Sequence, residues 1–254
     1  MTGRALIDHD RLLEVLGAEG ELMADTADGA PPGLTIPSRP TSTLADTIRH
    51  VGGVFRMVAA RLRGGNGPVR WESTPPPGGA LVEFLRGGLH DLVDELAAHP
   101  ADEVCDTWWT LDRTYGFWRR RMAHEATMHR IDVQSAVGVE VLSVDEGVAA
   151  DGIDEALTLW FAHRLSVIGV SGSAEFRVAV RSGDRVWLVS SHGDNKAAWR
   201  ASPADAEKAQ ATVSGDPMVV YLWLWGRSPF SAVRITGDTD AVAALWALLR
   251  LATH

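Results

Sequence analysis

The chain has 254 residues, 46% of them hydrophobic, and a formal net charge of −9. This length allows one large domain or two ordinary ones, and the acidic balance without a basic stripe argues against nucleic acid as a partner. The single cysteine, Cys105, excludes an intrachain disulfide. Neither a signal peptide nor an apolar run long enough to span a bilayer is visible, so we expect a cytoplasmic protein with no membrane partner.

Four segments of the first half have helical periodicity. Apolar residues recur at helical spacing over 8–26 and 44–65, and Thr43 or Ser42 can cap the second helix. Residues 80–99 and 112–138 predict a third and a fourth helix. The segments 27–43 and 67–79 are rich in Pro and Gly and are expected to be loops. Four long amphipathic helices joined by loops predict a four-helix bundle.

The pattern of the second half changes near residue 170. A fifth helix is expected over 145–165. Alternating apolar and polar residues then predict a β-hairpin around Ser182–Asp184 and strands at 209–215 and 231–237. Helices are expected from Asp216-Pro217 to Gly226 and over 238–251. We therefore predict an α+β fold with a helical bundle at 1–168 and a small α+β domain at 169–254.

The fourth predicted helix carries a candidate metal motif. Glu125 and His129 lie four residues apart, so their side chains stack one helical turn apart on one face. Both can reach one metal ion, and zinc takes three or four such ligands. The HExxH motif of zinc proteases is absent because position 128 is Met. By spacing alone, an exposed acid–imidazole pair that stabilises the helix remains an alternative.

A third ligand from another helix would favour the metal interpretation. His50 lies inside the second predicted helix and is the candidate, although a histidine beside an apolar stripe is, by itself, more often a partly buried core residue. Asp132 follows His129 on nearly the same face and can orient a ligand histidine. The triplet Arg119–Arg121 spreads around the helix and is expected to be solvated.

Three stretches resemble the mycothiol-dependent maleylpyruvate isomerase family, within the wider group of DinB-like metal-binding bundles. They are residues 44–65 with His50, residues 116–138 with Glu125 and His129, and residues 211–238. The resemblance covers nearly the whole chain. It implies a DinB-like four-helix bundle followed by a small C-terminal α/β domain. One departure is the segment 36–43, IPSRPTST, where family members often carry a Pro-x-Cys-x-x-Trp-like segment at the pocket entrance.

The resemblance also implies a site and its cofactors. His50, Glu125 and His129 match the metal ligands of the family, and the metal would be Zn²⁺ or another divalent ion. The thiol would be mycothiol, which implies an actinobacterial source. Two histidines and one carboxylate leave a zinc ion with net positive charge, which favours a thiolate at the open position. Cys105 lies outside the metal-bearing helices and is expected to be structural, so an external thiol suits the site better.

The expected function is therefore a thiol-dependent metalloenzyme, an isomerase or S-transferase that acts on a small electrophile. A metal-held thiolate would add to an electron-poor carbon, and the fate of the adduct separates isomerisation from transfer. Arg227, just past the helix that ends at Gly226, either holds a substrate carboxylate or bonds the last carbonyls of that helix. Asp132 is expected to act on a ligand histidine.

Other functions fit the same residues. A DinB-like hydrolase would use metal-bound water as the nucleophile. A non-catalytic ligand-binding or regulatory module would keep the metal bundle as a scaffold, with the Trp-rich C-terminal domain as an interaction surface. In a metal-free bundle the three residues would be coincidental. The sequence leaves open the substrate, the oligomeric state and the choice among Zn²⁺, Ni²⁺, Fe²⁺ and Mn²⁺.

Overall fold

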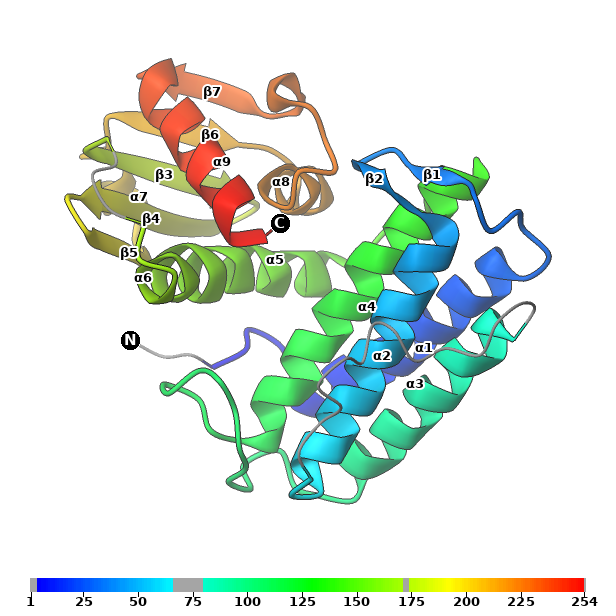
Figure 1. The fold of residues 1–254 in the computed structure, drawn as a ribbon. Coiled ribbons are helices and arrows are strands. Elements are labelled where there is room, and N and C mark those ends of the chain that lie inside the picture. The colour runs from blue at the N-terminus through cyan, green and yellow to red at the C-terminus, as the bar shows by residue number, and fades with distance from the viewer. Residues whose placement is uncertain (1–3, 66–79, 171–173, 254) are drawn as a thin grey trace. The chain divides into compact units, whose positions relative to one another are not determined.

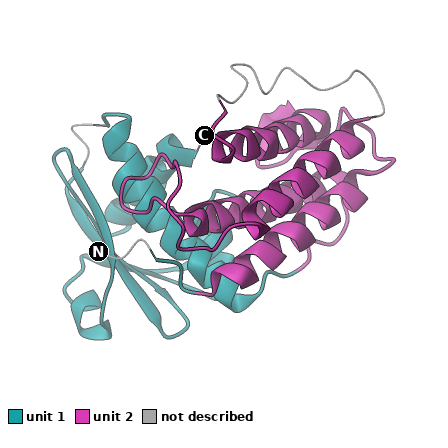
Figure 2. Ribbon diagram, turned by 90° about the horizontal axis from the view of Figure 1, so that it is seen from below, with its two compact units in different colours: residues 1–6, 143–254 teal, residues 7–142 magenta. Residues whose placement is uncertain are grey.

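The computed structural model describes residues 4–65, 80–170 and 174–253 (Figure 1). The chain forms two compact units, which Figure 2 distinguishes by colour. Residues 7–142 make up the bundle unit, and residues 1–6 with 143–254 make up the sheet unit. The predicted α+β fold, with helices first and a sheet second, is confirmed. No helix in the described ranges is long and apolar enough to cross a membrane.

The bundle unit contains four long helices and one short hairpin. Its described elements are α1 (His9–Ala27), β1 (Thr35–Ile36), β2 (Arg39–Thr43), α2 (Leu44–Leu62), α3 (Leu81–Ala97) and α4 (Tyr115–Val137). The four helices agree with the sequence prediction to within a few residues. The antiparallel hairpin β1–β2 was not predicted, because its segment was expected to be a loop. The predicted loop at 67–79 lies outside the described residues.

Ion pairs show the direction of the helices. α1 and α4 run in the same direction, because Arg119 pairs with Asp10 near the start of each helix and Arg130 pairs with Glu19 eleven residues further along α4. The second pair has a distance of 2.5 Å between Nε and a carboxylate oxygen. Both arginines are buried, and the two contacts tie the helices together over about half the length of each.

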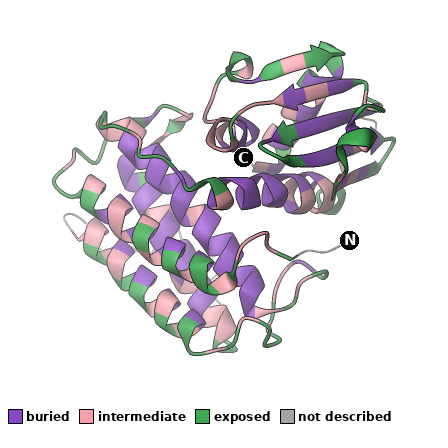
Figure 3. Cartoon of the chain, turned by 180° about the vertical axis from the view of Figure 1, so that it is seen from behind, coloured by how far each residue is buried: buried purple, intermediate pink, exposed green. Residues whose placement is uncertain are grey.

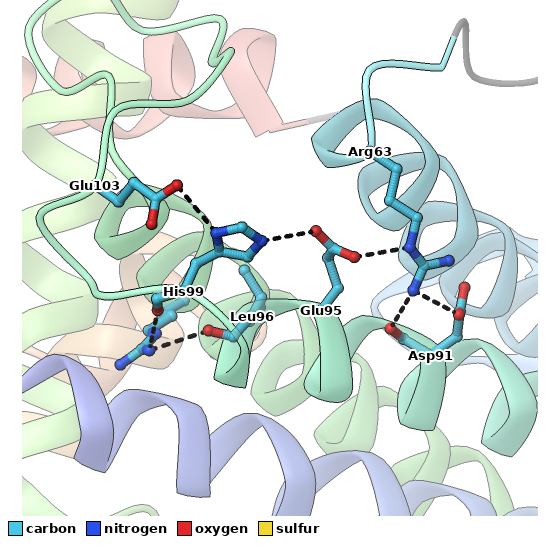
Figure 4. A network of polar contacts seen from close by, with 7 residues as sticks. Arg63, Asp91, Glu95, Leu96, His99 and Glu103 are labelled. Carbon is cyan, nitrogen blue, oxygen red and sulfur yellow. Dashed lines mark hydrogen bonds and ion pairs between the residues drawn. The ribbon is translucent and has the colours of Figure 1, made fainter.

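α2 and α3 also lie side by side and run in the same direction. The Arg56 guanidinium lies 3.9 Å from the centre of the Phe84 ring near the start of α3. Further along, Arg63 follows the end of α2 and lies 2.8 Å from Asp91 and 2.7 Å from Glu95, as Figure 4 shows. Exposed ion pairs of this kind contribute little stability individually, so the packed apolar faces carry most of the contact.

α4 is the most buried helix of the bundle, as its colour along most of its length in Figure 3 shows. The exposed fractions of Arg119, Arg120 and Arg121 are 4%, 2% and 3%, so the expectation of a solvated triplet was wrong. Arg119 pairs with Asp10 and donates to two backbone carbonyls, and Arg121 pairs with Glu125. A tertiary partner of Arg119 and a partner of Arg121 on the same helix thus allow these two charges to be buried.

The sheet unit begins with one long helical segment and continues with a mixed five-stranded sheet. Its described elements are α5 (Glu146–Glu155), the π-helical segment η2 (Ala156–Arg164), α6 (Leu165–Val167), β3 (Phe176–Ser182), β4 (Arg185–His192), β5 (Asn195–Arg200), α7 (Pro203–Ala206), β6 (Ala211–Ser214), α8 (Pro217–Leu224), the 3-10 turn η3 (Phe230–Ala232), β7 (Arg234–Gly237) and α9 (Thr239–Thr253). The strand order is β5-β4-β3-β6-β7, with β3 and β6 parallel and the other neighbours antiparallel. The sequence predicted β3, β4, β6 and β7 but neither β5 nor the π-helical geometry of η2.

The boundary between the units differs from the expected one at 168/169, because the division follows residue 142. The helix that begins at Glu146 belongs with the sheet. Its buried Asp154 accepts a hydrogen bond of 2.8 Å from Trp187 of β4 and pairs with Arg200 of β5 at 2.7 Å. The change of sequence period near residue 170 marks the end of this helix, so it placed the boundary one helix too late.

Candidate metal centre

The N-terminus of α2 has a regular capping box that fixes where the helix begins. The Thr43 hydroxyl accepts a hydrogen bond from the Asp46 backbone N–H, and the Asp46 carboxylate accepts one from the Thr43 backbone N–H. Such reciprocal bonds satisfy N–H groups that the first turn leaves without helical partners. His50 lies seven residues after the cap, where its side chain reaches α4.

The three predicted ligands lie together. His50 Nε2 is 3.1 Å from Glu125 Oε1, and His129 Nε2 is 3.4 Å from the same oxygen. The two imidazole rings have centroids 5.2 Å apart and planes inclined by 65°. One nitrogen or oxygen from each of the three residues lies within 4.8 Å of the other two. The carboxylate of Glu125 on α4 thus contacts both His50 on α2 and His129 on its own helix.

These distances suit a shared metal ion. Two ligand atoms at ~2.0–2.2 Å from one tetrahedral ion are separated by about 3.3–3.5 Å. The observed separations of 3.1 and 3.4 Å therefore need only small adjustments for an ion to enter. Two imidazoles and one carboxylate form a donor set that zinc and several other divalent ions accept.

Asp132 contacts the far side of one candidate ligand. Its Oδ2 lies 3.2 Å from His129 Nδ1, and its Oδ1 accepts a hydrogen bond of 2.6 Å from the hydroxyl of Ser38. The carboxylate is only 1% exposed. A proton held on Nδ1 by this carboxylate leaves the lone pair of His129 on Nε2, the atom that faces Glu125. The Ser38 contact links this arrangement to the hairpin β1–β2.

The electrostatics of the cluster favour an ionised Glu125. Burial raises its pKa, but hydrogen bonds with His129 and His50 and the charge of Arg121 outweigh burial and hold the pKa well below its usual value. Arg121 Nη2 lies 2.6 Å from Glu125 Oε2. Burial lowers the pKa of His129, yet its contacts with Asp132 and Glu125 raise it overall. Without a metal, the negative carboxylates thus hold the protons of the cluster on nitrogen.

A pocket of about 340 Å³ opens beside the candidate ligands. The candidate ligands His50 and His129 line it. The other lining residues come from β2 and the first turns of α2 and are Arg39, Ser42, Asp46, Thr47 and Arg49. The volume lies at the small end of the roughly 300–1,000 Å³ that ligand pockets usually have. The pocket can therefore bring a small molecule to the two histidines.

Comparison with known families agrees with this architecture. The family model of the mycothiol maleylpyruvate isomerase N-terminal domain matches residues 10–134, and that of the MDMPI C-terminal domain matches residues 147–244. The chain belongs to the mycothiol maleylpyruvate isomerase family. The two matches leave a short gap that contains the boundary between the bundle and sheet units. No match was found among curated proteins.

Solved structures share the fold at low sequence identity. A crystal structure of the mycothiol-dependent maleylpyruvate isomerase superposes with a TM-score of 0.60 at 14% identity, over 91% of this chain and 95% of that chain. A crystal structure of a histidine-to-alanine mutant of that isomerase gives a TM-score of 0.59 at 12% identity, with the same coverage. Identity this low supports the fold of this family member and says nothing about its substrate.

Arg227 and Cys105, which the sequence analysis also considered, are not among the three clustered residues. Arg227 belongs to the sheet unit, where its Nη1 donates a hydrogen bond of 2.8 Å to the carbonyl of Trp225 at the end of α8. This contact is the one expected of an arginine that bonds a helix end. A role of Arg227 toward a substrate stays a prediction. Cys105 lies in the connection between α3 and α4 and does not belong to the metal cluster.

Sequence reasoning missed three residues of the site. Ser38 and Arg39 lie in a segment that was treated as a loop, and Arg121 was assigned to a solvated face. For Arg121 a local signal existed, since it precedes Glu125 by four residues and can pair with it on one helix face. For Ser38 and Arg39 no local pattern indicates the site, because the hairpin reaches α4 only in the folded chain.

Proposed function

We propose that this chain is a metal-dependent enzyme that uses mycothiol to isomerise, or to transfer sulfur to, a small electrophile. The proposal is carried by one observation. His50, Glu125 and His129 converge within 4.8 Å beside a pocket of about 340 Å³, in a chain of the mycothiol maleylpyruvate isomerase family. The names of the family and of the similar crystal structures supply mycothiol and an unsaturated keto acid as starting hypotheses.

His50, Glu125 and His129 would hold the metal, for which zinc is our first candidate. When bound, a divalent ion supplies positive charge that keeps a thiol deprotonated at neutral pH. Addition of such a thiolate to a C=C bond, rotation and expulsion of the same thiolate would isomerise the substrate without net redox change. Retention of the C–S bond, with a proton added at the neighbouring carbon, would instead transfer the whole thiol to the substrate as a thioether.

The residues of the chain prepare this chemistry in defined ways. Asp132 lies 3.2 Å from His129 Nδ1 and would hold a proton on that nitrogen, and Ser38 donates a hydrogen bond to the Asp132 carboxylate. Arg121 occupies one oxygen of Glu125, so that the other oxygen faces the two histidines. Preorganisation of this kind avoids the cost of arranging the ligands when the substrate arrives. Arg227 is retained as a proposed partner of a substrate carboxylate.

Cys105 does not suit the role of nucleophile. Burial, reinforced by the charges of Asp112 and Asp106, raises its pKa to about 11. A thiol with this pKa is almost wholly protonated at neutral pH, and the thiolate is the reactive form. The thiol of the proposed reaction is therefore an external molecule.

Metal content and thiol dependence test the proposal. Purified protein without a histidine tag would be analysed by plasma mass spectrometry beside His50→Ala, His129→Ala and the control His90→Ala, whose side chain is 64% exposed on α3. We expect about one metal ion per chain in the wild type and the control, and strongly reduced content in the two site variants. Equal metal content in all four proteins would contradict the assignment of His50 and His129 as metal ligands.

The same proteins would then be assayed with maleylpyruvate, with and without mycothiol, following the change in ultraviolet absorbance. We expect turnover by the wild type and His90→Ala only when mycothiol is present. Turnover independent of thiol would favour the hydrolase alternative. Metal binding without turnover of this or other electrophiles would favour a non-catalytic module.

A further inference from the structure

The pocket beside the metal cluster contains two arginines in different electrostatic situations. Arg49 of α2 has its Nη1 3.0 Å from Asp46 Oδ1, so its charge is balanced within the helix. Within the described ranges of the chain, the Arg39 side chain makes no hydrogen bond or ion pair with another residue. Both arginines line the pocket. Arg39 therefore supplies the positive charge that the residues lining the pocket leave unbalanced.

The backbone on either side of Arg39 is held in place. Ile36, its partner in the hairpin register, is fully buried, and Ser38 donates a hydrogen bond to Asp132. Pro40 follows and restricts Arg39 to extended backbone conformations. These constraints fix the position of the Arg39 backbone at the pocket, next to Ser38, whose partner Asp132 contacts the candidate ligand His129. The backbone therefore loses little entropy when the guanidinium binds a ligand, and the cost is confined to the side chain.

The chemistry of this pocket selects an anion. A guanidinium presents two parallel N–H donors that match the two oxygens of a carboxylate. Ser42, which also lines the pocket, can add a hydroxyl donor. A volume of about 340 Å³ is sufficient for a compact organic acid.

We propose that Arg39 binds a carboxylate of the electrophile and thereby restricts the enzyme to small anionic substrates. The inference deepens the proposed function, because it assigns the substrate class of the same pocket. It places recognition on the segment 36–43 and so makes specificity a property of the hairpin. The metal ligands and Arg39 are then separate parts of one site.

A binding titration tests this assignment without any turnover. Maleate and its uncharged analogue maleamide have nearly the same shape, and calorimetry would measure the binding of each to the metal-containing protein. We expect the wild type to bind maleate more tightly, and Arg39→Met to weaken maleate binding by about tenfold to a hundredfold with maleamide unchanged. Arg39→Lys keeps the charge without the paired donors and should fall between the two.

Arg11→Met is the matched control, because it removes the same charge from an exposed pair with Glu14 on α1. Its neighbour Asp10 contacts Arg119, ten residues before His129 on α4 and hence roughly 15 Å away. The control should bind maleate as the wild type does. Equal affinity of the wild type for maleate and maleamide, or unchanged maleate affinity in Arg39→Met and Arg39→Lys, would overturn the assignment.

Failure of the proposed function would look different. Loss of thiol-dependent turnover in the wild type, with maleate still preferred over maleamide and the preference dependent on Arg39, would leave an anion-binding pocket without the proposed reaction. If the wild type turns over the electrophile and Arg39→Met does so with an unchanged KM, the proposed reaction is supported and the role of Arg39 in substrate binding is contradicted. If Arg39 binds the substrate, its loss raises the KM for the electrophile and leaves the KM for mycothiol unchanged.

Discussion

The hydroxyl of Ser38 lies 2.6 Å from a carboxylate oxygen of Asp132, although the two residues are 94 positions apart. The other oxygen of Asp132 lies 3.2 Å from His129 Nδ1. The hairpin, the buried carboxylate and a candidate metal ligand thus form one continuous chain of contacts. We therefore expect the hairpin to influence the affinity for the metal.

Removal of the Ser38 hydroxyl should weaken metal binding. In Ser38→Ala the Asp132 carboxylate loses a fixed partner and holds His129 less firmly, and loss of such outer contacts typically reduces affinity by about 10–100-fold. Competition with a chromophoric chelator would measure the affinity. Thr41→Ala, on an exposed position of the same hairpin, is the control and should bind metal like the wild type. An unchanged affinity in Ser38→Ala would show that the hairpin does not support the metal centre.

Removal of Arg121 should destabilise the metal-free protein more than the metal-loaded protein. Its pair with Glu125 is nearly buried, and loss of one partner from a buried pair costs about 3–5 kcal/mol. A bound divalent cation would compensate part of the buried charge that the loss of Arg121 leaves unpaired on Glu125. Urea unfolding of Arg121→Met with EDTA and with zinc would measure both losses. The exposed pair of Arg11 and Glu14 provides the comparison, since Arg11→Met should cost about 1 kcal/mol or less. Equal losses with and without zinc would contradict the prediction.

The capping box of α2 should make part of the stability depend on pH. Hydrogen bonds from Thr43 lower the pKa of Asp46 below its ordinary value of 3.8. A lowered pKa in the folded state stabilises the protein above the unfolded pKa, and this contribution is lost as the pH falls through the folded pKa. Asp46→Ala should therefore lower the free energy of unfolding by about 1 kcal/mol at pH 7.

The difference in free energy of unfolding between wild type and Asp46→Ala should shrink as the pH falls below about 4, the ordinary pKa of the carboxyl group. Thermal unfolding at pH 7, 5, 4 and 3 would measure this difference. Asp184→Ala removes the same charge from an exposed turn and should show no such trend. A difference that grows toward low pH would contradict the sign of the pKa shift.

Cys105 should react slowly with alkylating reagents. Its pKa of about 11 means that the thiolate fraction rises roughly tenfold for each pH unit between 7 and 10. The rate of iodoacetamide addition, followed by intact mass, should rise in the same proportion. Cys105→Ala should keep its metal content and its thiol-dependent turnover. A reaction rate that already levels off below pH 9 would show a much lower pKa than the structure indicates.

Local periodicity in the sequence was enough to predict the helical part of the fold. The 3.6-residue period predicted α1, α2, α3 and α4, and Thr43 with Asp46 marked the start of α2. The spacing of Glu125 and His129 placed them on one helix face, because helix geometry depends only on neighbours along the chain. The predicted bundle made His50 a plausible third ligand from a facing helix, and the family resemblance supported that choice.

The tertiary structure decided what depends on contacts between distant segments. Arg119 became buried because Asp10 of α1 and two backbone carbonyls at the end of α3 and just after it satisfy its charge. The hairpin β1–β2, with its link from Ser38 to Asp132, has no local signature stronger than its prolines. The unit boundary at 142/143 likewise depends on which partners bury Asp154. In each case the free energy of a polar group is set by a partner far away in the sequence, which no local pattern contains.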